Sequence, residues 1–210
     1  ERPDKSLLNS VRTGLVYALR HRTIRTILSC DLTVCFFAFS FQYLLPVFAR
    51  DVLEIGPTGL GLLVASRGLG AVVMGVAMSS MIGLTPRPSL TFGGAASFAL
   101  LVALFALSPW FVVSLVALFI VGCAAQVYDA STTSVLQLEA EASFRGRVVG
   151  LQRTAWGTTS LGSMVTGAAA MFIGPPAAVA LAALIPAAWS LNLLLRSRRM
   201  KTSETSDIPT

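Results

Sequence analysis

Hydrophobic positions in this chain form six continuous stretches, each about as long as a membrane-spanning helix. A helix of about 20 apolar residues crosses the roughly 30 Å hydrocarbon core of a bilayer. Most of the breaks between stretches carry glycine and proline, which form turns. The pattern predicts an all-α polytopic membrane protein with six transmembrane helices. In chain order the stretches are Ile24 to Phe48, Thr58 to Met81, Ser89 to Leu107, Trp110 to Leu138, Val148 to Ile173 and Ala177 to Leu195.

The composition agrees with residence in a membrane. Hydrophobic residues make up 54% of the 210 positions and charged residues 12%, about half of the roughly 25% typical of soluble domains. The net charge of +6 does not point to nucleic acid, because the basic residues cluster between apolar stretches, where they orient membrane proteins. The three cysteines and the single histidine, His21, offer no metal-ligand spacing. We therefore expect no cofactor, no metal and no nucleic-acid partner.

The distribution of basic residues predicts an orientation. If successive loops alternate between the two sides, almost all loop and terminal Lys and Arg residues fall on one side, and Arg50 alone falls on the other. Basic residues mark cytoplasmic loops, so we expect both termini in the cytoplasm. Residues 1–22 have apolar side chains at helical spacing and predict a linker with an interfacial amphipathic helix. Residues 23–196 form the predicted six-helix domain, and the polar residues 197–210 predict a disordered cytoplasmic tail.

Four charged residues interrupt the apolar stretches: Asp31, Arg67, Asp129 and Arg153. Each costs about 2.5 to 3.5 kcal/mol at the centre of a bilayer, so such residues are usually paired or functional. Their order, Asp, Arg and none in the first three helices and again in the last three, predicts two inverted three-helix repeats with the third and sixth helices peripheral. Arg153 lies at the level of both aspartates and is the expected partner of one. Each residue is a candidate for a substrate or proton pathway, or alternatively for a structural ion pair.

Three segments carry a resemblance to a known family: Leu45-Pro46-Val47-Phe48-Ala49-Arg50-Asp51-Val52-Leu53, Ser66-Arg67-Gly68-Leu69-Gly70-Ala71 and Arg145-Gly146-Arg147-Val148. Together they resemble the major facilitator superfamily, in the bacterial branch of the enterobactin exporter and macrolide-efflux proteins. The resemblance concerns helices seven to twelve, the C-terminal half of a twelve-helix transporter. It implies alternating access, with the first and fourth helices of this chain lining the cavity. Arg145, Gly146 and Arg147 match a cytoplasmic loop motif that acts as a conformational latch, although the proline usual before it is missing from residues 139–144.

These features predict the C-terminal half of a proton-coupled antiporter in the bacterial inner membrane. Its substrates would be amphipathic small molecules such as siderophores or drug-like compounds, and its partner the missing N-terminal half or a second copy. The alternative is a six-helix membrane protein, or truncated half, with a structural role. An intramembrane serine protease is disfavoured, because the chain has no Gly-x-Ser-x-Gly motif and no histidine within a stretch.

Overall fold

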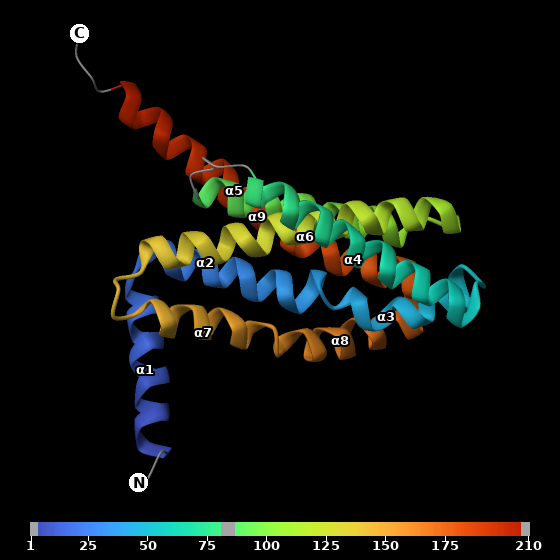
Figure 1. The fold of residues 1–210 in the computed structure, drawn as a ribbon, viewed down its shortest axis with the longest axis horizontal. Coiled ribbons are helices and arrows are strands. Elements are labelled where there is room, and N and C mark those ends of the chain that lie inside the picture. The colour runs from blue at the N-terminus through green and yellow to red at the C-terminus, as the bar shows by residue number, and fades with distance from the viewer. Residues whose placement is uncertain (1–3, 81–86, 207–210) are drawn as a thin grey trace.

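The chain is an all-helical bundle (Figure 1). The computed structural model describes residues 4–80 and 87–206, with side chains for 12–80 and 87–197. All regular structure within these residues is helical, which confirms the predicted class. The elements are α1 (Asp4–Arg20), α2 (Arg22–Thr33), the π-helix η1 (Val34–Ala38), α3 (Phe41–Val47), the π-helix η2 (Phe48–Val52), α4 (Gly56–Ser80), α5 (Pro88–Ala106), α6 (Phe111–Glu139), α7 (Arg145–Ala155), α8 (Thr158–Ile173) and α9 (Pro175–Ser206).

Five helical segments in the described part of the chain are long and apolar enough to cross a membrane. They correspond to five of the six predicted stretches, although the predicted end of the second, Met81, lies outside the described residues. They are Arg22–Val52, Gly56–Ser80, Pro88–Ala106, Phe111–Glu139 and Pro175–Ser197. The protein is therefore a multi-pass membrane protein.

The predicted stretch Val148 to Ile173 is not one helix but two, α7 and α8, which follow one another along the bundle (Figure 1). At the junction the amides of Trp156 and Gly157 bond three residues back, to the carbonyls of Arg153 and Thr154 at 3.3 and 3.0 Å. Such tight turns interrupt the regular α-helical ladder. Gly157 and the β-branched Thr158 are weak helix formers. The hydropathy pattern reports only how apolar a segment is, so it could not predict this interruption.

The helix ends also differ from prediction at the C-terminus. The segment expected to be a disordered tail from residue 197 instead continues α9 as far as Ser206, and residues 207–210 lie outside the described part. Arg198, Arg199, Met200 and Lys201 are good helix formers, and they outweigh the serine and threonine content on which the prediction rested. At the N-terminus α1 forms as predicted and runs across the end of the bundle (Figure 1); its placement at a membrane surface stays a prediction.

The first membrane-spanning segment is irregular beyond α2, from Val34 to Val52. In η1 the amide of Phe39 bonds to the carbonyl of Val34, five residues back, and in η2 the amide of Leu53 bonds to that of Phe48, both at 2.9 Å. Pro46 lies between them, in α3, and has no amide hydrogen to donate. π-Helical turns of this kind occur mostly at functional sites, and η1 separates the two polar groups described below.

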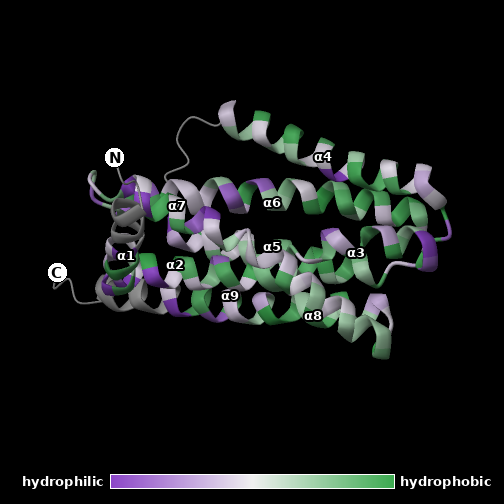
Figure 2. Cartoon of the chain, turned by 90° about the horizontal axis from the view of Figure 1, so that it is seen from below, coloured by the Kyte–Doolittle hydropathy of each residue, from purple (hydrophilic) through white to green (hydrophobic). Residues whose placement is uncertain are grey.

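Close helix contacts are made at glycines. A methyl group on Gly70 of α4 would overlap the carbonyl oxygen of Phe119 in α6, and one on Gly122 of α6 would overlap the carbonyl oxygen of Arg67 in α4. The thiol of Cys123 adds a hydrogen bond to the Gly70 carbonyl at 3.2 Å. Small residues thus let the two backbones touch, as they do in other membrane bundles. Figure 2 shows α4 packed along α6 here and diverging from the bundle toward its C-terminal end.

The third predicted helix, α5, was expected to lie at the periphery, but only one of its sides is exposed. Alanines of α5 are buried, and α5 packs between α6 and α9 (Figure 2). Its other side exposes Leu100, Leu104 and Leu107. The small residues of α5 thus pack closely against α6 and α9.

Candidate functional site

A buried polar contact joins Asp31 of α2 to Tyr128 of α6. The Tyr128 hydroxyl donates a hydrogen bond to Asp31 Oδ1 at 2.7 Å. Asp31 is 1% exposed and Tyr128 2% exposed. The second carboxylate oxygen, Oδ2, has no hydrogen-bond partner among the described residues. The carboxyl group is therefore sealed from solvent and only half satisfied.

The second contact joins Asp129 of α6 to Arg153 of α7. Arg153 Nη1 lies 3.4 Å from Asp129 Oδ1. Both side chains are partly exposed in this chain, at 51% for Arg153 and 31% for Asp129. The ion pair predicted for Arg153 is thus made with Asp129, on an open face of α6 and α7.

We call the four residues of these two contacts, together with Gln152, which precedes Arg153 in α7, the carboxylate cluster: Asp31, Tyr128, Asp129, Gln152 and Arg153. Asp31 lies close enough to interact electrostatically with both Asp129 and Arg153. Gln152 is fully buried, accepts a hydrogen bond from Thr133 at 3.2 Å and leaves its Nε2 without a partner in the described part. Three of the four predicted intramembrane charges therefore meet across α2, α6 and α7, with one net negative charge when both aspartates are ionised.

Arg67 lies apart from the cluster. Its Nη1 donates to Gln42 Oε1 at 2.7 Å, and its guanidinium lies 5.7 Å from the ring centre of Phe41. The Gln42 amide in turn donates to the Phe39 carbonyl at 3.1 Å, next to the end of η1. Arg67 Nε is buried without a partner, and no carboxylate within the described ranges pairs with Arg67. A cation is thus held at the irregular part of the first span by neutral groups only.

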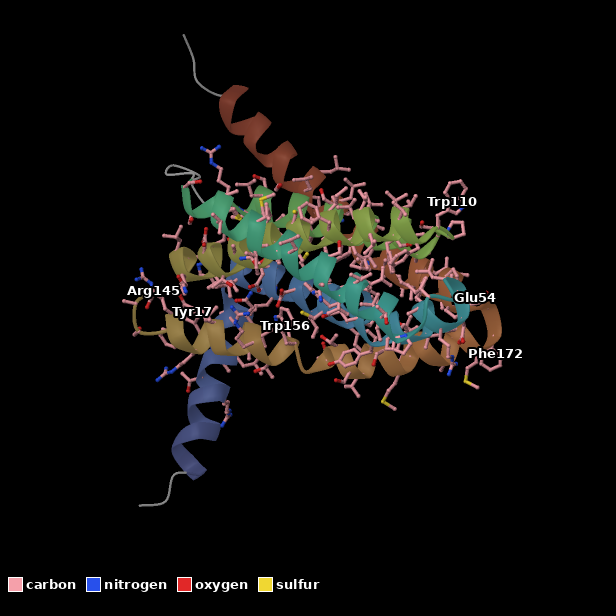
Figure 3. All side chains as sticks on the ribbon, turned by 45° about the vertical axis from the view of Figure 1, so that its right-hand side comes forward. Tyr17, Glu54, Trp110, Arg145, Trp156 and Phe172 are labelled. Atoms are coloured by element: carbon pink, nitrogen blue, oxygen red, sulfur yellow. The ribbon has the colours of Figure 1, made fainter. Side chains whose placement is uncertain are left out.

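The motif Arg145-Gly146-Arg147, predicted to lie in a loop, instead forms the first turn of α7, at the end of the bundle where α1 crosses it. Arg145 Nε donates to the Ala140 carbonyl at 3.3 Å, and the Arg147 guanidinium lies 5.2 Å from the ring centre of Phe144. Gly146 has open space beside it. Figure 3 shows Arg145 and Tyr17 at this end, and Glu54, Trp110 and Phe172 at the other.

The loop that precedes α7 is fastened to α1 by aromatic contact. The rings of Tyr17 and Phe144 stack at 4.2 Å between centroids, with 6° between their planes. The Tyr17 hydroxyl also accepts a hydrogen bond from the Glu141 amide at 3.2 Å. Gly14 packs directly on the Arg147 side chain. The two arginines of the motif therefore contact the loop that precedes α7, and Arg147 also contacts α1. Neither forms an ion pair with an acidic residue of the described chain.

Sequence reasoning found the charges of this site but missed the neutral residues that hold them. The sequence did not lead us to predict a role for Tyr128, although this residue lies next to Asp129 in the fourth apolar stretch and could have been considered a polar partner. Gln42 and Gln152 were also missed, and each is a rare amide inside an apolar stretch. Polar residues within membrane segments are expected to bond to one another, so the signal was present.

Charged and amide side chains gathered between membrane-spanning helices are typical of membrane transport proteins. The family model described as transmembrane secretion effector, MFS_3, matches residues 1–209, and the chain belongs to this family. It is thus a transporter of the MFS type, as the resemblance implied. No match was found among curated proteins or among solved structures.

Proposed function

We propose that this chain is the C-terminal half of a proton-coupled exporter that carries amphipathic small molecules out of the bacterial cell by alternating access. The observation that carries the proposal is Asp31, a carboxyl group sealed between helices with one oxygen left without a partner. Intramembrane acidic residues of this kind commonly serve proton relays in transporters. The enterobactin-exporter and macrolide-efflux branch, and siderophores or drug-like compounds as substrates, belong to this proposal.

Asp31 is the proposed proton carrier. Holding an ionised carboxylate among apolar groups costs free energy unless every oxygen is hydrogen-bonded or paired. A proton on Oδ2 removes the charge, while Tyr128 continues to donate to Oδ1. Asp129 and Arg153 supply a nearby ion pair whose separation changes the field at Asp31. Loading and release of the proton are thereby linked to the spacing of α6 and α7.

Arg67 and Gln42 are the proposed substrate-facing groups. They lie where the first span departs from regular α-helix, and such irregular backbone at membrane depth occurs where it is covered by protein or lines a cavity. Arg67 has a buried Nε without a partner and Phe41 an apolar ring beside it, and a movement of the helices that opens this region would present both to the substrate. Together these groups suit a molecule with one polar and one apolar side.

The partner completes the transporter. Alternating access requires two halves that rock against each other around a central site. The partly exposed pair Asp129 and Arg153 marks the face on which we place the second half, either the N-terminal six helices or a second copy. Both termini are placed in the cytoplasm, where Arg145, Gly146 and Arg147 act as the latch between α1 and the bundle.

The test is transport by the intact protein in proteoliposomes under an imposed pH gradient. Asp31→Asn and Asp129→Asn remove the two acidic groups, and Asp51→Asn is the control, since Asp51 is exposed and paired with Arg50 at the opposite end. We expect Asp31→Asn to abolish the response of efflux to the gradient, and Asp51→Asn to retain it. Unchanged gradient dependence in both cluster variants would exclude Asp31 and Asp129 as proton carriers.

The nature of the partner has its own test. Two copies of this chain carrying different tags are expressed together and captured through one tag. Recovery of the second tag supports a homodimer, and its absence supports a separate N-terminal half.

A further inference from the structure

A cavity outside the transport groups lies at the basic end of the bundle. It has a volume of about 830 Å³ and is bounded by the starts of α2 and α5, the middle of α6 and the end of α9. Its lining includes Arg22 and the hydroxyl residues Thr23, Ser89 and Ser97, and it contains no Asp or Glu among the described residues. The cavity is thus cationic, and a negative group entering it meets no repulsion from its walls.

The polar groups of this cavity are free to bind a ligand. Arg22 is exposed and forms no ion pair within the described ranges. The hydroxyls of Thr23, Ser89 and Ser97 likewise make no hydrogen bond to another part of the described chain. Arg87 and Arg196, both exposed, are the sequence neighbours of the lining residues Pro88 and Ser197 and add positive charge to this end of the bundle. A phosphate, with several acceptor oxygens, matches a guanidinium flanked by hydroxyl donors.

An apolar groove lies beyond the cavity, between α5 and α6. A second hollow of about 390 Å³ lies between α5 and α6, with Leu101 and Ile120 at its near end. These residues are one helical turn beyond Ser97 and Ala124, which line the cationic cavity. From Leu90 to Leu101 the path along α5 measures about 17 Å at 1.5 Å per residue, close to the roughly 15 Å of one leaflet of the hydrocarbon core.

We propose that this cavity and groove bind an anionic phospholipid of the leaflet at the basic end, with the phosphate at Arg22 and one acyl chain between α5 and α6. Basic pockets between helices on this side of a membrane favour anionic headgroups. The groove supplies an apolar surface for an acyl chain. A free phosphate has no acyl chain and would gain nothing from this surface. The site depends on membrane residence alone and not on the proposed proton-coupled export.

The experiment measures lipid retained by the purified chain in native mass spectrometry. Phosphatidylglycerol, phosphatidylcholine with the same acyl chains, and inorganic phosphate are offered separately. Arg22→Gln removes the cation, and Arg12→Gln, an exposed arginine of α1 outside the cavity, is the control for net charge. We expect phosphatidylglycerol to be preferred, and Arg22→Gln to weaken its binding about tenfold, as loss of one hydrogen bond to a charged group implies.

A second variant tests the site without changing charge. Gly93 lines the cavity and a side chain there meets no atom within 4 Å, so Gly93→Leu fills the space while the helix remains able to form. Gly61→Leu, on the open face of α4, is the matched control. We expect Gly93→Leu to reduce binding of phosphatidylglycerol and Gly61→Leu to leave it unchanged. Equal binding of the two lipids, equal effects of the two arginine variants, or binding of inorganic phosphate as strongly as lipid would each overturn the proposal.

Discussion

Tyr128 and Asp31 are linked by a 2.7 Å hydrogen bond that joins α6 to α2 across 97 positions of sequence. Tyr128 precedes Asp129, which pairs with Arg153 on the neighbouring face of α6. Two consecutive residues of one helix thus contact two different helices, α2 and α7. A movement of α6 therefore acts on both contacts of the carboxylate cluster at once.

Replacing Tyr128 with Phe tests the buried contact. The variant keeps the ring and removes the only donor to Asp31 in the described chain. We expect a loss of about 1.5 to 3 kcal/mol of stability, the range for a hydrogen bond to a charged group. Thermal unfolding of the purified protein measures it. Tyr43→Phe is the control, because Tyr43 is 57% exposed, and equal losses in the two variants would contradict a special role for Tyr128.

The ion pair between Asp129 and Arg153 is tested by a double-mutant cycle. Asp129→Asn or Arg153→Gln alone leaves one charge without its partner, whereas the double variant removes both. Since both side chains are partly exposed, we expect a coupling of about 1 kcal/mol or less in the isolated chain. Denaturation of the four proteins yields the coupling. Strictly additive losses would show that the pair contributes nothing to stability.

The glycine contact between α4 and α6 predicts opposite effects at two neighbouring glycines. A methyl at Gly70 overlaps the Phe119 carbonyl, whereas one at Gly68 meets no atom within 4 Å. Overpacking costs about 1 to 3 kcal/mol, and alanine is favoured over glycine in a helix by about 1 kcal/mol. We therefore expect Gly70→Ala to lower the unfolding temperature and Gly68→Ala to leave it equal or higher. The same shift for both would argue against the close contact.

Gln42 is predicted to hold Arg67 in place. Gln42→Leu removes the acceptor of the Arg67 guanidinium, which leaves a partly buried cation without its hydrogen bond and costs about 1.5 to 3 kcal/mol. Adding Arg67→Met to Gln42→Leu removes that unsatisfied cation. Unfolding measurements should show the double variant more stable than the sum of the single losses; a simple sum would mean that the two residues act independently.

The stack of Tyr17 on Phe144 predicts that α1 is released when either ring is lost. Aromatic pairs contribute about 0.5 to 1.5 kcal/mol beyond their buried area. In Tyr17→Leu we expect faster amide hydrogen exchange in α1 and in the loop before α7. Leu15→Ala is the control, since Leu15 is 43% exposed on the same helix. Unchanged exchange in Tyr17→Leu would show that other contacts hold α1.

Hydropathy correctly predicted the segments that are apolar throughout and bounded by a clear helix-breaking residue. Ser89 to Leu107 and the observed α5 agree within a residue because the stretch is uniformly apolar and is preceded by a proline. The division of α7 from α8 escaped prediction, since it depends on local turns at Trp156 and Gly157 and leaves the apolar average unchanged. The extension of α9 to Ser206 was not predicted either. The charged and hydroxyl residues of this segment suggested disorder, although several of them have a high helix propensity.

The charges of the candidate site and the pairing of Arg153 with an aspartate were predictable, and the contacts made by neutral residues were not. Intramembrane Asp and Arg stand out in any apolar stretch, so Asp31, Arg67, Asp129 and Arg153 were identified. The partner of each charged residue depends on how its helix is rotated about its axis. The sequence of a helix that is hydrophobic on most faces does not specify that rotation. That is why Arg67 was not expected to bind Gln42, and why Tyr128 was not connected to Asp31.

The π-helical segment η1 lies between Asp31 and Gln42 on one continuous span. A π-turn contains one residue more than an α-turn closed by the same kind of bond. Converting η1 to α-helix would pass that surplus residue along the span, turning everything beyond it by about 100° and sliding it by about 1.5 Å. An α-helical η1 would therefore point Gln42 in a different direction while the hydrogen bond between Asp31 and Tyr128 stays in place.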